Sequence, residues 1–546
     1  MNRTSSIAGS LLPVLLLLAA VLLRLPYLMN AEHLLDSDVA FNALAVRHLF
    51  QGEVFFLYYP GQDYQGITEG VLGILLTKLL GWSAFAYIGS AFLAYLAYVV
   101  VLYGLARILF DGRTAVLAGW LAVVMPVPML RYSLFARGGH VEVLLAGVLL
   151  LLFTVRFERS RRPIWLALIG FTAGFAYYTY KLSVVVIAPV FVHLGLQALN
   201  TLFAPDATGS SLALRFHSFR QRHALSLLLG LVFLFVGLLP ALTAIWLAPP
   251  EVSKPPVQQV EQGPWRENAR RLFSQTLPSL LGCDTQEADR RSWPGHARNM
   301  LIVSVLGAAL IGTLWTVFRR DTRRMLLRER GGLSPESLLL LALAAVPAAY
   351  ISTRYIVDPT SSRYLIPLYV VLPLLIGSVT VKWAGAFRRP VPQAVAAWLP
   401  VVLLAGVYLH DTVQFYRSTG LLASRGCAIR QPAYAPRDVL QHLRHEGISG
   451  AYGTYWLAYH LTFLADEKVL VAPYKGIDQR KPPDYYRLLR GYRNPAYLFL
   501  ATDLVQRQEF VQAMESQGIR LKARFFPGFK GGIYVFTAAK GTLPHL

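Results

Sequence analysis

Long apolar runs constrain this chain more than any other feature of its sequence. They recur from the N-terminus to about residue 410, and many are long enough to cross a bilayer as a helix of roughly 20 residues. Of the 546 residues, 55% are hydrophobic and only 15% are charged. A water-soluble protein of this length could not bury so much apolar surface. The chain is therefore expected to be an α-helical polytopic membrane protein.

About eleven transmembrane helices are expected from the length of these runs. The first, over residues 7–28, has the position of a signal peptide. Its apolar run is longer than a signal peptide needs, however, and no small-residue cleavage site follows it cleanly, so we interpret it as a span. The other expected spans are 84–109, 115–131, 140–156, 164–180, 182–200, 224–248, 299–318, 336–352, 364–384 and 393–410.

The arginine-rich loops predict the orientation. If the spans alternate, all of these loops fall on one side, and the positive-inside rule places that side and the N-terminus in the cytoplasm. Loops 29–83 and 249–298 and the C-terminus then face the periplasm or the cell exterior. The same loops explain the net charge of +22. No basic stretch carries a nucleic-acid-binding motif, so nucleic acid is not an expected partner.

The sequence after residue 410 has a different pattern from the rest of the chain. Helix-like stretches alternate with four strand-like ones, at 468–472, 496–501, 521–526 and 532–537. This alternation predicts a compact α/β domain on the periplasmic or extracellular side. The chain thus divides into a membrane module, 1–410, and a C-terminal domain, 411–546. Cys283 and Cys427 are the only cysteines, which excludes a zinc ribbon and leaves one disulfide between them open.

Acidic residues follow the first span. Asp36, Ser37 and Asp38 precede an apolar pattern at helical spacing, which predicts an amphipathic helix on the membrane surface with Ser37 as its N-cap. Asp38 would lie in the first turn, where the helix dipole favours a carboxylate. Such a carboxylate could accept a proton from an incoming hydroxyl. The alternative is that these acids only start the helix.

Cations lie at the outward-facing ends of several spans. They are Arg131 and Arg137 with His140, Arg354 and Arg363 with Asp358, and Lys181. Cations at span ends often only anchor a helix among lipid headgroups. Several guanidinium groups facing one acidic loop instead favour anion binding, because the guanidinium fork matches a phosphate.

Several catalytic motifs do not occur in the sequence. There is no GxxxxGK[ST], no GxGxxG after a strand, no HExxH and no GxSxG, so nucleotide hydrolysis, zinc proteolysis and nucleophile-elbow chemistry have no support. DSD is formally a DxD motif, but it faces away from cytosolic nucleotides. The sequence requires no cofactor and has no four-ligand metal set, although a divalent cation stays open.

Four stretches resemble the multi-span GT-C glycosyltransferases. The resemblance is to bacterial members like the dolichyl-phosphate-mannose protein mannosyltransferases, family 39 and its RgtA/B/C/D-like relatives. The stretches are DSDVAFNALAVRHLFQGE with YYPGQDYQGITEG, RGGHVEVLLAG, SRYLIPLYVVLP and AYGTYWLAYHLTFLADEKVLVAP. Together they span most of the chain in the expected order.

The resemblance implies an inverting transferase that moves one sugar from a polyprenyl-phosphate donor to an acceptor hydroxyl on the outer face. Asp38 takes the position of the catalytic Asp and would act as general base. Arg131, Arg137 and Arg363 are implied to bind the donor phosphate, and Lys181 could bind the same anion. The residues implied to contact substrate are His48, Gln62, Tyr64, Glu69 and His140. The acceptor stays open among lipid, glycan and protein.

One departure from the family stands beside the proposed base. The family usually has Glu directly after that Asp, where this chain has Val39. Either the second acid is dispensable, or Asp36 or Glu69 replaces it, or activity has been lost. Two other classes remain as alternatives: a lipid-linked sugar transporter or flippase, and a non-catalytic relative that binds a lipid-linked glycan.

Overall fold

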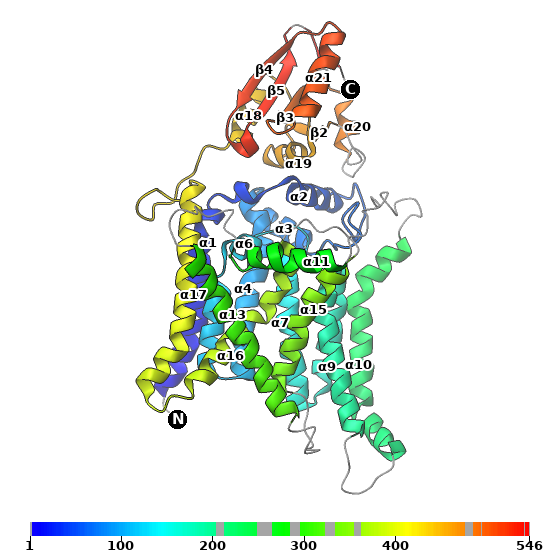
Figure 1. Cartoon of the computed structure of the whole chain (residues 1–546). Helices are drawn as coiled ribbons and strands as arrows, with labels where there is room; N and C mark the ends of the chain where they lie inside the picture. The colour runs from blue at the N-terminus through cyan, green and yellow to red at the C-terminus, as the bar shows by residue number, and fades with distance from the viewer. Residues whose placement is uncertain are drawn as a thin grey trace.

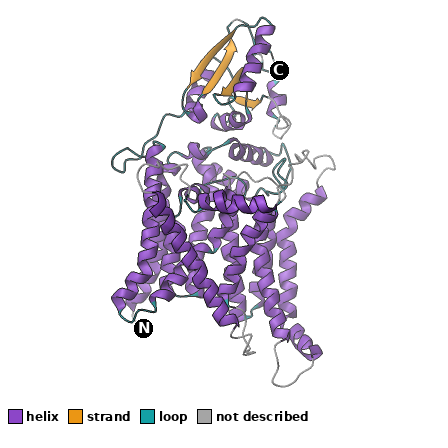
Figure 2. Cartoon of the chain, in the orientation of Figure 1, coloured by secondary structure: helices purple, strands orange, loops and turns teal. Residues whose placement is uncertain are grey.

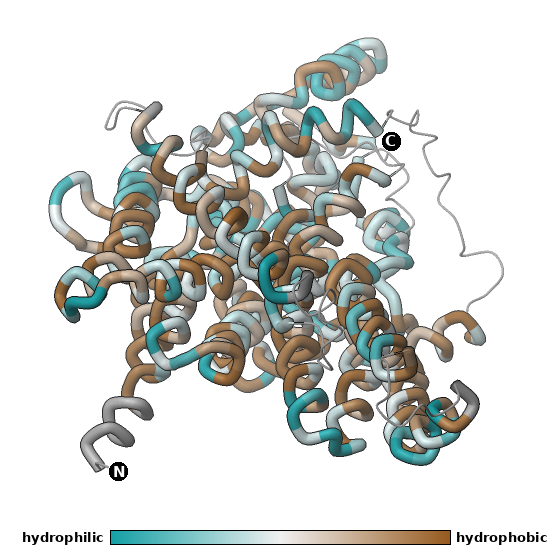
Figure 3. Tube along the Cα trace, turned by 60° about the horizontal axis from the view of Figure 1, so that its bottom comes forward, coloured by the Kyte–Doolittle hydropathy of each residue, from teal (hydrophilic) through white to brown (hydrophobic). Residues whose placement is uncertain are grey.

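The computed structural model describes residues 3–203, 212–247, 265–283, 295–322, 334–353, 362–474, 484–492, 494–539 and 541–544. A bundle of long helices carries a small sheet domain at one end, which we call the capped end (Figure 1). Strands are drawn only in that domain (Figure 2), and apolar residues predominate along the bundle helices (Figure 3). This is the architecture of a multi-pass membrane protein with a C-terminal sheet domain.

Within the described residues, eight helices are long and apolar enough to cross a membrane. They are α1 (Arg3–Leu28), α4 (Ala84–Leu109), α7 (His140–Ser160), α9 (Val184–Phe203), α10 (Leu212–Leu247), α13 (Gly295–Val317), α15 (Pro335–Ser352) and α17 (Pro390–Ser418). A ninth span is possible if η5 (Ser362–Val370) and α16 (Leu372–Ala384) count as one, although they meet at a bend of 45°.

The remaining expected spans are shorter than a bilayer requires. The span expected at 115–131 is broken into α5 (Gly112–Val123) and α6 (Val127–Tyr132), because Pro126 and Pro128 interrupt the helical hydrogen-bond ladder. The span expected at 164–180 is α8 (Pro163–Thr179), with 17 residues. All eleven expected segments are therefore helical, but only eight or nine meet the length and hydropathy of a span.

Shorter helices lie near the capped end. They are α2 (Ser37–Phe50), α3 (Thr68–Leu80), α11 (Trp265–Arg271) and α12 (Leu277–Leu280). We expected α2 to be an amphipathic helix on the membrane surface, and this is wrong. Val39, Phe41 and Val46 are all fully buried, because α2 lies between the bundle and the sheet domain and is covered on both sides (Figure 1).

The sheet domain has five strands in the order β2-β1-β3-β5-β4. They are β1 (Gly450–Gly453), β2 (Leu470–Pro473), β3 (Ala496–Leu500), β4 (Leu521–Phe526) and β5 (Ile533–Ala538). β2, β1 and β3 are parallel, and β5 pairs antiparallel with both β3 and β4. Its helices are α18 (Ala435–His445), α19 (Tyr455–Leu464), α20 (Tyr485–Leu489) and α21 (Leu504–Ser516). Four strands match the predicted ones, and β1 was not predicted.

The last transmembrane helix extends beyond its predicted end. We predicted that it ends at residue 410, but α17 continues to Ser418. The predicted division of the chain at residue 410 therefore falls inside a helix. Cys283 and Cys427 are both free thiols, so the disulfide left open by the sequence is not formed.

The sheet domain is fixed to α2 by a polar junction. Arg47 forms an ion pair with Asp466 at 2.8 Å, and the Nε2 atom of His48 lies 2.7 Å from a carboxylate oxygen of Glu467. The Tyr485 hydroxyl also donates to Glu467, at 2.6 Å. The predicted substrate contact His48 is thus engaged with the sheet domain.

The packing of α8 against α10 predicts the effect of one added methyl group. A Cβ atom at Gly170 would overlap the carbonyl oxygen of Gly230, so Gly170→Ala must push the two backbones apart. We expect a loss of about 1–3 kcal/mol, read as a lower Tm of the detergent-solubilised protein. Gly195→Ala is the control, because no atom lies within 4 Å of the added group. Equal Tm values for the two variants would contradict this packing.

The His48 junction predicts a pH dependence of stability. Burial alone would lower the pKa of His48, but hydrogen bonds to Glu467 and Glu53 raise it above its ordinary value. The stabilisation of the folded state by protonated His48 is therefore complete below about pH 6.5, and it is lost as pH rises through the raised pKa. We expect Tm to fall over that range in wild type, and the fall to be reduced in His48→Gln.

The matched control for the pH dependence is His445→Gln, since His445 is exposed at the end of α18. The contribution of Glu467 to stability depends on pH in the opposite direction, and at lower pH. Burial would raise its pKa, but the hydrogen bonds of His48 and Tyr485 lower it, so its stabilisation is lost as pH falls through the lowered pKa. The prediction fails if His48→Gln and His445→Gln have the same Tm profile above pH 6.5.

Candidate active site

The start of α2 presents two carboxylates at the capped end of the bundle. We predicted Ser37 as the N-cap, and this is wrong: Asp36 is the N-cap, and its side chain accepts from the N–H of Val39 at 2.9 Å. The Ser37 hydroxyl instead donates to the carbonyl oxygen of Tyr455, at 2.5 Å. Asp38 lies in the first turn, as predicted, where it complements the helix dipole.

One guanidinium group faces both carboxylates. Arg137 is in the loop between α6 and α7, and its Nη2 atom forms an ion pair with Oδ2 of Asp38. Its Nη1 atom lies 3.6 Å from Oδ2 of Asp36. The three side chains are between 16% and 24% exposed, so they are shielded but still reachable from solvent. The predicted base and one predicted phosphate ligand are thus in direct contact.

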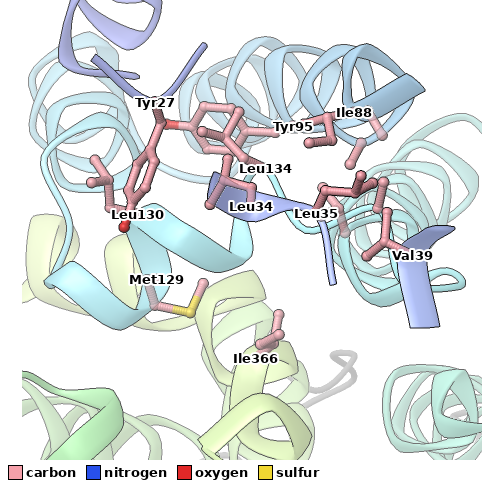
Figure 4. Packing of buried hydrophobic residues seen from close by; sticks show 14 of the residues in the cluster. Tyr27, Leu34, Leu35, Val39, Ile88, Tyr95, Met129, Leu130, Leu134 and Ile366 are labelled. Carbon is pink, nitrogen blue, oxygen red and sulfur yellow. The ribbon is translucent and has the colours of Figure 1, made fainter. Parts of the chain in front are cut away.

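The side chain of Val39 takes no part in this polar group. It is fully buried and packs in the apolar core near Leu35 (Figure 4). Asp36 is the acid that accompanies Asp38, because both face Arg137. Of the two acids considered as replacements for the missing Glu, Asp36 is the one whose described contacts include Arg137, while Glu69 binds Gly138 and Gly139.

Glu69 supports the loop that carries Arg137. Its Oε2 atom accepts the backbone N–H groups of Gly138 and Gly139, the latter at 2.8 Å. Both glycines have positive φ, 86° and 95°, which favours residues without a Cβ. A Cβ at Gly138 would also overlap Gln65. Burial raises the pKa of Glu69 well above its usual range, against the effect of the two amides.

A cavity of about 430 Å³ lies between α3, α4, α7 and α8. Glu69 and Glu142 line it, together with mostly apolar side chains such as Leu93, Leu149 and Phe175. Glu69 therefore faces this cavity on one side and the glycine loop on the other. Its described contacts are with that loop and not with Asp38.

Arg363 forms a second cationic position, surrounded by tyrosines. Its Nη2 atom donates to the Tyr364 hydroxyl at 3.1 Å, and it interacts electrostatically with Arg137. Tyr64 and Tyr180 also interact electrostatically with this guanidinium group. Burial lowers the pKa of Arg137, Asp36 opposes this effect, and the positive charge of Arg363 adds to it.

The other predicted residues lie around this centre. His140 is buried, with its ring 4.8 Å from that of Tyr180, and Lys181 is half-exposed with Nζ 3.7 Å from Asp63. Gln62 is in a partly exposed turn, and Arg131 is exposed in the last turn of α6. Arg354 and Asp358 lie outside the described residues.

Two residues of the sheet domain were missed. The Tyr455 hydroxyl donates to Oδ1 of Asp38, and Lys530 interacts electrostatically with Asp36. Both are far from α2 in sequence, so no local pattern could have placed them there. In the described part of the chain, no group of three or more His, Cys, Asp or Glu side chains could hold a metal ion.

Comparisons with known proteins show which family and which solved structures the chain is similar to. Residues 72–209 match the family model described as dolichyl-phosphate-mannose-protein mannosyltransferase. The fold is similar to the crystal structure of ArnT from Cupriavidus metallidurans bound to undecaprenyl phosphate, with a TM-score of 0.55 and 13% identity over 100% of both chains. The chain therefore has the GT-C fold, and residues 72–209 are similar to this mannosyltransferase family.

The chain is also similar to the crystal structure of the Archaeoglobus fulgidus oligosaccharyltransferase in complex with Zn and sulfate. The TM-score is 0.50 and the identity 15%, over 97% of this chain and 73% of that chain. Among curated protein sequences, none matches the chain. The superfamily resemblance stated from the sequence is therefore confirmed at the level of the fold and of the matched segment.

The contacts of Glu69 predict how its substitution acts. Glu69→Ala leaves two buried N–H groups without an acceptor, and we expect a loss of about 1–3 kcal/mol, seen as a lower Tm. Glu69→Gln keeps a carbonyl oxygen at the same place and should lose less. Glu515→Ala, at an exposed position on α21, is the control and should retain the wild-type Tm. A Tm for Glu69→Ala equal to that of the control would contradict the supporting role.

Proposed function

We propose that the protein is an inverting glycosyltransferase that transfers a single sugar from a polyprenyl-phosphate donor to an acceptor hydroxyl on the outer face of the bacterial inner membrane. The observation that carries the proposal is the contact between Asp38 and Arg137, which pairs a carboxylate at the family's base position with a phosphate-binding cation. In this proposal the N-terminus is cytoplasmic and the sheet domain is periplasmic.

Asp38 acts as the general base. In the structure its Oδ2 atom is engaged by Arg137. When the donor phosphate arrives, its greater charge competes for the Arg137 guanidinium, and Oδ2 becomes available to the acceptor. Asp38 then takes the proton of the acceptor hydroxyl as that oxygen attacks the anomeric carbon. Attack from the face opposite the leaving phosphate inverts the anomeric centre.

Arginines stabilise the departing polyprenyl phosphate. The bond between the anomeric carbon and the phosphate oxygen breaks, and its electron pair leaves with the phosphate. The positive charge of Arg363 is close enough to lower the pKa of Arg137, and we expect one phosphate to bind both guanidinium groups. Two guanidinium groups facing the developing negative charge favour the transition state without a general acid. We expect the exposed Arg131 and the half-exposed Lys181 to guide the anion toward this site.

The isoprenoid chain of the donor is accommodated in the cavity lined by Leu93, Leu149 and Phe175. Its apolar lining suits hydrocarbon. Glu69 connects the cavity to the Arg137 loop, so a chain bound there would keep the phosphate near the arginines. ArnT, which has the same fold, was crystallised with undecaprenyl phosphate, and this supports a lipid of that class. The acceptor is a lipid, glycan or protein hydroxyl.

The proposal is tested by sugar transfer in membranes supplied with radiolabelled polyprenyl-phosphate sugars. We expect wild type to consume one of these donors and Asp38→Asn to lose about 10²–10⁴-fold in rate, the usual contribution of a general base. Asp36→Asn should lose much less, because Asn also caps a helix well. Asp438→Asn, at an exposed position on α18, is the matched control and should transfer at the wild-type rate.

Two outcomes would overturn the proposal. If wild type consumes none of the donors, transport or glycan binding becomes the better explanation. If Asp38→Asn transfers as fast as Asp438→Asn at equal expression, Asp38 is not the base. A transporter would instead move labelled lipid across proteoliposomes without forming a glycosylated product.

A further inference from the structure

The sheet domain reaches directly into the candidate active site. Tyr455 is the first residue of α19, and its hydroxyl donates to Oδ1 of Asp38. Its own carbonyl oxygen accepts from the Ser37 hydroxyl at 2.5 Å. The beginnings of α2 and α19 are therefore joined by two hydrogen bonds that run in opposite directions. One bond is made to Asp38, the proposed base, and the other is made by its neighbour Ser37.

A second residue of the sheet domain faces the other carboxylate. Lys530 is in η7 (Phe529–Gly531), between β4 and β5, and interacts electrostatically with Asp36. Its ammonium group lies 4.3 Å from the ring centroid of Trp456, the neighbour of Tyr455. Lys530 has φ 46°, and Gly528 and Gly531 beside it also have positive φ. This tight turn places Lys530 where its charge interacts with Asp36.

These contacts fix the orientation of the Asp38 carboxylate. Arg137 of the bundle holds Oδ2, and Tyr455 of the sheet domain holds Oδ1. A base works efficiently only when its lone pair points at the proton that it removes. If Arg137 turns to the donor phosphate, Tyr455 is the contact that still restrains the carboxylate.

We propose that the sheet domain completes the active site, with Tyr455 as a positioning residue that holds Asp38 for catalysis. This inference rests on the proposed function, because it takes Asp38 as the base. During the step, the acceptor proton moves to Oδ2 of Asp38, the acceptor oxygen bonds to the anomeric carbon, and the phosphate leaves with the electrons of the broken bond. Tyr455 keeps its own proton and its bond to Oδ1 throughout.

The test uses the full-length protein and the variant Tyr455→Phe, which removes only the hydroxyl. We expect kcat to fall about tenfold or more, as for the loss of a hydrogen bond to a charged group, with KM for donor and acceptor unchanged. Tyr497→Phe is the matched control. It removes another hydroxyl of the same domain, which donates to Pro544 at 2.6 Å within that domain. Its kcat should equal that of wild type.

A structural role would give a different result. Loss of docking would lower Tm in Tyr455→Phe well below that of Tyr497→Phe, and it would raise KM together with the fall in kcat. The inference is overturned if Tyr455→Phe keeps the wild-type kcat, if Tyr497→Phe loses as much, or if KM and Tm account for the loss. Asp38→Asn, assayed in parallel, separates the two proposals. If Asp38→Asn is inactive and Tyr455→Phe is fully active, the positioning role of Tyr455 is refuted and the base role of Asp38 is not.

Discussion

The ion pair between Arg137 and the two carboxylates of α2 is the interaction on which the capped end depends. It joins a loop between two bundle helices to the start of a helix that follows the first span. Each partner requires its own support. Asp36 caps α2, Glu69 holds the backbone next to Arg137, and two glycines permit the turn. The site is thus assembled from segments that are distant in sequence, and the Arg137 ion pairs join them directly at the carboxylates.

Burial of α2 has a second effect on the site. A helix between two layers is restrained on both faces, so its first turn is held more firmly than the end of a surface helix. The polar junction at Arg47 and His48 secures the far end of the same helix. The carboxylates therefore lie on a rigid element, which favours a preorganised site over one that forms on binding.

Much of this arrangement could be predicted from local sequence, because hydropathy and helix-start signals act over short distances. The apolar segments and the place of Asp38 in a first turn follow from such signals. Ser37 was mistaken for the cap because Asp36 competes for the same role. Strand β1 is four residues long and begins and ends with glycine, so it has no strand pattern. Tyr455 could not be placed, since its contact with Asp38 spans 417 positions.

The length of α10 has a consequence for how deep the protein sits in the bilayer. Its 36 residues correspond to about 54 Å of helix, against a hydrocarbon thickness of about 30 Å. Tilting within the usual range of about 0–40° cannot absorb this excess. One end must therefore extend into the headgroup layer, and the end that carries Arg215, Arg220 and Arg222 is suited to anionic lipids. That end lies opposite the capped end (Figure 1), so α10, which packs on α8 through glycines, extends out of the hydrocarbon on the side away from the candidate active site.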